Sequence, residues 1–325
     1  MKRLFSALAL GLALIGAPLH AAAQGMALTA AAGPVAGTSY VGLGALCKLI
    51  TTAHPDANVN LIPGSDVSNP LRIANKEVDI ACETVCFSTA AKEGIAPFKK
   101  PVGNILSLAN LRTEALLNVA VRADSGITSF EQIKEKKLPL RLGPGPRGSA
   151  SQVLLEWTLA EYGISFKDIT AWGGKIFNNN FNDVSDMAKD GQVDMIAWLG
   201  PGEAWFLTEL SANTQLRWLP VSKEAADALN KKYMLYTGSF PASMYKGMMG
   251  RETRTVGTAM SLLVREDMSE DTAYRIARIL CEGREDIGTA CPQWNTFKPE
   301  TAFSDMPYPL HPGAAKYYRE AGLMK

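Results

Sequence analysis

Arg147, Gly148 and Ser149 form the first group of residues whose types and spacing suggest a binding site. A short apolar run ends at Gly143, a turn of glycine and proline follows, and apolar residues with helical spacing begin after Ser149. This order predicts a strand, a loop and the N-terminus of a helix, where unpaired N–H groups and the helix dipole favour an anion. The Arg147 guanidinium would add a full positive charge. The stretch therefore predicts a carboxylate site.

The same loop has the spacing of a dinucleotide-binding fingerprint, Gly143-x-Gly145-x-x-Gly148. Pro144 and Pro146 each remove a backbone donor from the part of the loop that would bind a pyrophosphate. We therefore expect no nucleotide at this loop, and the sequence suggests no other cofactor.

The loop belongs to a unit of alternating strands and helices that the sequence contains twice. Gly33 and Gly143 each precede a proline and lie 110 residues apart, and Asp79 and Asp194 each lie in a Val-Asp-apolar strand and are 115 residues apart. Chance similarity is the alternative explanation, and the shared Gly-Pro and Val-Asp-apolar patterns argue against it. Helices are expected over 41–52, 69–74, 149–162 and 182–189, and strands over 58–62, 78–81, 168–172 and 193–197.

Alternating strands and helices imply a parallel sheet in each copy, whose ligands bind beyond the carboxyl ends of the strands. Glu83 and Trp198 follow Asp79 and Asp194 by the same four residues, so both are expected at such ends, facing a cleft. Glu83 could accept hydrogen bonds from a ligand amine, and Trp198 could cover an apolar or planar group. The other candidate contacts are Thr38, Ser39, Tyr40, Ser65, Thr84 and Gly200.

Each candidate also has a purely structural interpretation, which the sequence leaves open. Thr38 and Ser39 could only cap a helix, Glu83 could pair with a lysine, Trp198 could belong to the core, and Arg147 could extend into solvent.

Two extended runs outside the copies, 116–121 and 255–264, predict that the chain crosses twice between two lobes. We expect one lobe from 24–125 and 255–325 and the other from 126–254, with hinges near 124–126 and 254–256. Further helices are expected over 271–287 and 313–320, the latter with Pro312 at its first position.

Residues 1–23 have the pattern of a secretory signal peptide. Lys2 and Arg3 precede an apolar stretch over 4–19, and three alanines over 21–23 form a cleavage site. The stretch is short for a membrane anchor, and Pro18 interrupts it. The pattern predicts cleavage after Ala23 and a periplasmic protein.

The composition restricts the classes of binding partner that the protein is expected to have. The formal net charge is only +1 and no basic block occurs, so the sequence gives no reason to expect nucleic acid or a membrane surface as a partner.

Export permits disulfides, and a bridge between Cys281 and Cys291 is the preferred pairing. Cys82 and Cys86 could be a metal pair or, more simply, buried thiols. Cys47 completes an odd count of five.

Several stretches in a shared order resemble the TAXI class of extracytoplasmic solute receptors for TRAP transporters. They are 37–40, 64–69, 77–80, 121–127, 255–257 and 309–318, the last being the most specific. The resemblance covers nearly all of the expected mature chain. It implies a type II periplasmic-binding fold with two α/β lobes and a ligand cleft between them. It also implies a small carboxylate or amino-acid ligand, like glutamate or 2-oxoglutarate, and TRAP permease subunits as partners.

The sequence departs from the resemblance at two places. Residues 146–151 replace a loop that usually reads Gly-Ser-Gly-Thr, and Glu83 replaces a glutamine or neutral polar residue. Both departures leave the identity of the ligand open.

Two other functions remain as alternatives: a receptor for an ABC importer or a sensor kinase, and a periplasmic enzyme. The sequence has no Gly-x-Ser-x-Gly elbow and no metal-ligand cluster, and no Cys or Ser has a base signalled near it. We therefore expect no enzyme.

Overall fold

The computed structural model describes residues 26–35, 37–241, 243–245, 248–249 and 252–325. The expected signal peptide and its cleavage site lie outside these residues. No helix in the described part of the chain is both long enough and apolar enough to cross a membrane.

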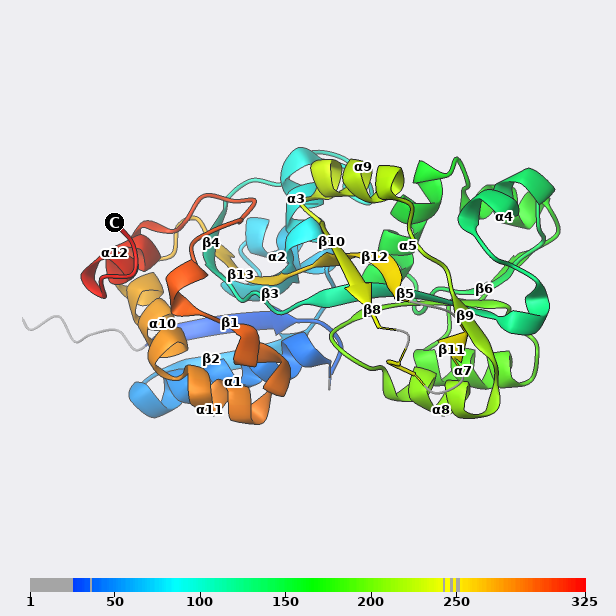
Figure 1. Cartoon of the computed structure of the whole chain (residues 1–325). Helices are drawn as coiled ribbons and strands as arrows, with labels where there is room; N and C mark the ends of the chain where they lie inside the picture. The colour runs from blue at the N-terminus through cyan, green and yellow to red at the C-terminus, as the bar shows by residue number, and fades with distance from the viewer. Residues whose placement is uncertain (1–25, 36, 242, 246–247, 250–251) are drawn as a thin grey trace, which may run out of the picture.

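Two β-sheets lie side by side, as Figure 1 shows. The first has the strand order β2-β1-β3-β13-β4, and the second has the order β10-β12-β5-β8-β6-β7, with β9 and β11 attached through β5. The first sheet consists of β1 (Ala27–Ala32), β2 (Asn58–Pro63), β3 (Ile80–Thr84), β4 (Ile105–Asn110) and β13 (Met260–Arg265). The second consists of β5 (Ala115–Arg122), β6 (Arg141–Gly143), β7 (Lys175–Ile176), β8 (Met195–Gly200), β9 (Leu216–Trp218), β10 (Tyr236–Phe240), β11 (Met248–Met249) and β12 (Thr253–Thr258).

Helices cover both sheets. Those that follow strands of the first sheet are α1 (Thr38–Ala53), α2 (Ser68–Ala74), α3 (Val85–Glu93), α10 (Glu270–Glu282), α11 (Arg284–Ala290) and α12 (Pro312–Glu320). Those that follow strands of the second are α4 (Phe130–Lys136), α5 (Ala150–Glu161), α6 (Phe166–Ala171), α7 (Phe181–Lys189), α8 (Trp205–Asn213) and α9 (Lys223–Tyr233). The expected class, α/β with two lobes, is confirmed.

The two predicted copies occupy equivalent places in the two sheets. Ile80 of β3 pairs with Ala30 of β1, and Met195 of β8 pairs with Leu142 of β6, in both cases parallel. The aspartate before each of these strands accepts a hydrogen bond from the first strand: Thr29 N donates to Asp79 (2.6 Å), and Arg141 N donates to Asp194 (3.0 Å). These two aspartates fix the register of their sheets.

The chain crosses between the sheets at 111–114, from β4 to β5, and again at Ala259, from β12 to β13. The expected lobe limits at 125 and 255 therefore fall within or just after strands of the second sheet. We propose that the lobes are divided at 111–114 and Ala259, and that these two crossings are the hinge.

Two local expectations were wrong, and a third is refined. Residues 168–172 form most of a helix, α6, because Ser165 and Asp168 make a capping box, with Ser165 N donating to Asp168 (2.8 Å) and Asp168 N to Ser165 Oγ (3.1 Å). The helix expected over 271–287 divides at Gly283 into α10 and α11. The extended run expected over 255–264 is present, as two strands that meet at the crossing at Ala259.

The expected disulfide between Cys281 and Cys291 is also wrong, since all five cysteines are free and buried. Burial raises the pKa of the Cys281 thiol, on the inner face of α10, to about 12. The Cys291 thiol donates instead to the carbonyl of Thr38 (3.5 Å).

Candidate functional site

The carboxyl end of β3 brings two carboxyl groups together. Asp66 lies in the turn after β2, and its Oδ1 accepts hydrogen bonds from the backbone N (3.2 Å) and the hydroxyl (2.9 Å) of Thr84. Glu83, the neighbour of Thr84 in β3, lies close enough to Asp66 that the charge of Asp66 raises its pKa. Burial raises the pKa of Asp66, although its bonds to Thr84 oppose that shift. Asp66 is half-buried, so solvent still reaches it.

Glu83 is sealed in the protein, with 1% of its surface exposed. Neither of its carboxyl oxygens has a hydrogen-bond partner. Burial, and then the charge of Asp66, hold the pKa of Glu83 well above its usual range. Asn69, whose amide donates to the carbonyl of Ala32 (3.2 Å), opposes this shift as the smallest of the three causes. Glu83 is therefore a neutral acid at the end of the strand, and a ligand would meet Asp66 first.

The other candidates of the first lobe also lie at strand ends. Ser39, in the first turn of α1, accepts a hydrogen bond from Gly33 N (3.0 Å) and so holds the helix start against the end of β1. Thr38 and Tyr40 are half-buried beside it. Ser65 exchanges hydrogen bonds with Ser68 (3.0 Å between hydroxyls), which ties the turn to the start of α2.

In the second lobe, the loop between β6 and α5 is built on two glycines in the left-handed region, Gly145 (φ 87°) and Gly148 (φ 74°). Ser149 caps α5, its hydroxyl oxygen accepting from Gln152 N (3.3 Å). The Gln152 side chain accepts in turn from Gly148 N (2.8 Å), so that N–H group is already used. The N–H groups of Ala150 and the next residue remain without a partner among the described residues.

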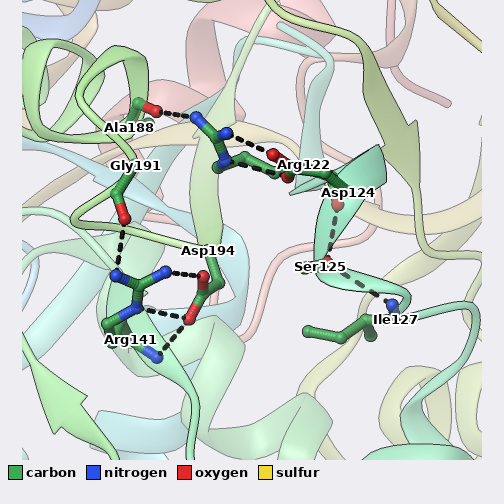
Figure 2. A network of polar contacts seen from close by, with 8 residues as sticks. All are labelled: Arg122, Asp124, Ser125, Ile127, Arg141, Ala188, Gly191 and Asp194. Atoms are coloured by element: carbon green, nitrogen blue, oxygen red, sulfur yellow. Dashed lines mark hydrogen bonds and ion pairs between the residues drawn. The ribbon is translucent and has the colours of Figure 1, made fainter.

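Arg147 is exposed and makes no ion pair or hydrogen bond with the described residues. Two other arginines of this lobe are fully engaged, as Figure 2 shows. Arg122 donates to Asp124 and to the carbonyl of Ala188, and Arg141 binds Asp194.

Those contacts hold the C-terminal end of α7 at the amino end of β8, the opposite end from the expected site. Cations there also complement the helix dipole. Arg147 is thus the arginine of this loop that is available to a ligand.

Trp198 and Gly200 form the end of β8. Trp198 lies three residues after Met195, as Glu83 lies three after Ile80, so the two residues hold the same position in their strands. That both contact a ligand stays a prediction. The indole covers Gly200, where a Cβ atom would lie 2.1 Å from the ring. It packs edge-on against Phe206, with ring centroids 6.1 Å apart. Trp198 is half-buried.

The structure therefore gathers the candidates into two groups, one at the strand ends of each lobe. Cavities of about 300 and 430 Å³ lie elsewhere, the first beside Trp157 of α5 and the second beside Leu71 of α2, and no candidate residue lines either one.

Asp66, Asn69 and Gln152 are the polar residues of these groups that sequence reasoning missed. A carboxylate directly after the turn at 63–65 could have indicated Asp66, whereas the amides carry no signal in a single sequence.

A family model described as the NMT1-like family matches residues 30–322. Among solved structures, PhnD1 from Prochlorococcus marinus in complex with methylphosphonate is similar, with 13% identity, 92% of this chain and 99% of that chain covered, and a TM-score of 0.54. XAC2383 from Xanthomonas citri bound to ATP has 15% identity, covers 91% and 96% of the two chains, and has a TM-score of 0.51. These likenesses concern the fold.

Proposed function

We propose, from the premise that this chain belongs to the NMT1-like family and has the fold of periplasmic binding proteins, that it is a receptor for a small solute. It would capture the solute between its two lobes outside the inner membrane and deliver it to a membrane importer. Lobe closure around the solute would be the signal that the importer reads.

The observation that carries the proposal is a pair of opposite charges, one near the strand ends of each lobe. Arg147 is an unengaged cation in the loop after β6, and Asp66 is a half-buried carboxyl beside the end of β3. A solute with an anionic group and a protonated amine would be complementary to both. The structure of PhnD1, a protein of similar fold, is of a complex with methylphosphonate.

We infer that the anion lies between the Arg147 guanidinium and the start of α5. The donors would be the guanidinium, the Ser149 hydroxyl and the N–H of Ala150. Gly148 contributes by its left-handed conformation rather than by its N–H, which Gln152 occupies.

The importer is better sought among ABC systems than among TRAP permeases. Family membership and the likeness to PhnD1 support the ABC alternative more than the TRAP partner that the sequence resemblance implies. A glutamate-like ligand likewise rests on that resemblance alone.

Substitution of the arginine is the first prediction. Each hydrogen bond to a charged group contributes roughly 1.5–3 kcal/mol, so Arg147→Ala should weaken solute binding about tenfold to a few hundredfold. Arg147→Lys should recover only part of the loss, because an ammonium does not bind an anion in two-point geometry. Titration calorimetry with the solute identified by native mass spectrometry measures the effect.

Arg319→Ala is the matched control, since Arg319 is an exposed arginine on α12. Melting curves of all variants check the fold. Wild-type affinity in Arg147→Ala would falsify the anion site, and the absence of any bound solute in the purified wild type and in titrations would contradict the receptor function.

A further inference from the structure

Four strands of the second sheet meet in one row beside the two crossings. Leu116 of β5 pairs with Gly200 of β8 on one side and with Gly257 of β12 on the other. Gly257 pairs in turn with Tyr236 of β10. The row therefore reads Gly200, Leu116, Gly257, Tyr236 across the sheet.

The two glycines leave room for two aromatic rings. A Cβ atom on Gly200 would lie 2.1 Å from the Trp198 ring, and one on Gly257 would lie 2.6 Å from the Tyr236 ring. The rings thus lie over the glycines on either side of Leu116. Trp198, Leu116 and Tyr236 are each only half-buried, and we call these three side chains the ring surface.

Two buried polar atoms beside the ring surface have no partner. Asn118 pairs with Trp198 across the strands and is 2% exposed. Its amide N–H donates to Leu116 O (3.0 Å), but its Oδ1 accepts no hydrogen bond. The Tyr236 hydroxyl is also buried and unpartnered, and burial raises its pKa, so it stays protonated. Such atoms destabilise a folded protein, which is the reason they are rare away from ligand sites.

The ring surface is close to the carboxyl groups of the first lobe. Gly257 belongs to the row, and Met260, three residues on, pairs with Thr84, which binds Asp66. At about 3.3 Å per residue, Gly257 and Met260 are at most roughly 10 Å apart along the chain, across the crossing at Ala259. A molecule of amino-acid size is comparable in length with this separation.

We propose that the ring surface binds the apolar part of the solute, and that the solute is an amino acid or related amine with an apolar or aromatic side chain. Its protonated amine faces Asp66, and its side chain lies between Trp198 and Tyr236 over Leu116. Ring faces of this kind favour aromatic and aliphatic groups. A second carboxylate, as in glutamate or 2-oxoglutarate, would be placed against apolar side chains, where its charge is unfavourable. This inference rests on the proposed function, since it assigns the substrate class of that receptor.

Calorimetric titration of ligand-stripped protein with L-phenylalanine, L-leucine, L-glutamate and 2-oxoglutarate tests the inference. We expect the two apolar amino acids to bind at least about tenfold more tightly than the two dicarboxylates. Trp198→Ala and Tyr236→Ala should each weaken phenylalanine binding by about tenfold or more. Trp172→Ala is the matched control, because Trp172 is a half-buried tryptophan beyond the end of α6.

Three outcomes would overturn the assignment: tighter binding of glutamate or 2-oxoglutarate, binding of none of the four compounds, or equal phenylalanine affinity in the ring variants and the control. Native mass spectrometry of the wild type separates this result from the proposed function. A co-purified solute that the ring variants retain fully contradicts the ring surface only, whereas a wild type that binds no solute contradicts the receptor function itself.

Discussion

Glu83 is the residue whose environment departs furthest from what its type suggests. A carboxylate that is 1% exposed and has no hydrogen-bond partner is unfavourable in its charged form, and Asp66 adds a second charge of the same sign. The folded protein therefore holds Glu83 as the neutral acid. A charge on Glu83 would raise the pKa of two neighbouring groups, the Cys82 thiol and the Tyr308 hydroxyl.

The raised pKa of Glu83 has a direct consequence for stability. A group whose pKa is raised on folding stabilises the fold fully below its unfolded pKa, here 4.5, and loses that contribution as the pH rises. Glu83→Gln removes the titration while keeping the shape, so it should raise the melting temperature more at about pH 8 than at about pH 5. Scanning calorimetry at both pH values, with exposed Glu266→Gln as control, measures this. An equal shift at both would show that Glu83 is not held neutral.

For His311 we expect the opposite dependence of stability on pH. Its Nδ1 accepts from Gly313 N (3.1 Å) at the start of α12, so Nε2 carries the proton and donates to Met268 O (3.0 Å). Burial lowers the pKa of His311 from 6.5, so its contribution to stability is present above about pH 6.5 and lost as the pH falls.

His311→Asn keeps a capping oxygen without a titrating ring. The variant should lose less stability than the wild type between about pH 7.5 and about pH 5.5 in urea unfolding. A wild-type pH dependence in the variant would contradict this role for His311.

At the scale of elements, Trp157 of α5 joins the two lobes. Its indole N–H donates to Ala96 O (3.0 Å), in the loop after α3. Its ring stacks on Tyr233 of α9 (3.8 Å between centroids, 7° between planes) and contacts Phe87 of α3 (5.1 Å). Figure 1 shows α3 and α9 side by side above the sheets. The lobes are thus attached by an aromatic cluster as well as by two crossings.

Loss of that cluster should be costly. Trp157→Ala removes a buried ring and its hydrogen bond, and should destabilise the protein by about 3–5 kcal/mol. Trp205→Ala, at a tryptophan that is 61% exposed, should cost no more than about 0.5 kcal/mol. Urea unfolding followed by circular dichroism compares them, and similar losses in the two variants would refute the joining role.

At the scale of the whole molecule, one hydrophobic core runs through both lobes. Phe87 and Ala91 of the first lobe belong to the same buried cluster as Leu154 and Tyr233 of the second. Two further clusters are confined to one lobe each, around Leu46 in the first and around Phe206 in the second. Neither lobe can unfold alone without exposing part of the shared core.

The molecule should therefore unfold in one cooperative step. Scanning calorimetry should give a single peak whose calorimetric and van't Hoff enthalpies agree. In Trp157→Ala the peak should shift down and broaden. Two separate transitions in the wild type would mean that the shared cluster does not couple the lobes.

The α/β class, the two copies and the position of the candidate residues at strand ends could all be predicted from the sequence alone. These features rest on local patterns, namely apolar periodicity, Gly-Pro turns and the Val-Asp strands, which act over a few residues. Pro312 at the start of α12 belongs here too. The wrong prediction at 168–172 also has a local cause. The segment has the composition of a strand, but the capping box at Ser165 favours a helix.

What each candidate side chain can do depends on its tertiary contacts, which the sequence does not show. Glu83 and Trp198 are equivalent in the chain, yet one is sealed and neutral and the other lies half-exposed over a glycine, because burial depends on what packs from distant segments. Three other findings depend on distant segments in the same way: the free cysteines, the hydrogen bond from Arg122 to Ala188, and the contact of Asp66 with Thr84. Pairings between residues far apart in sequence leave no mark in a single chain, since each partner alone is compatible with many neighbours.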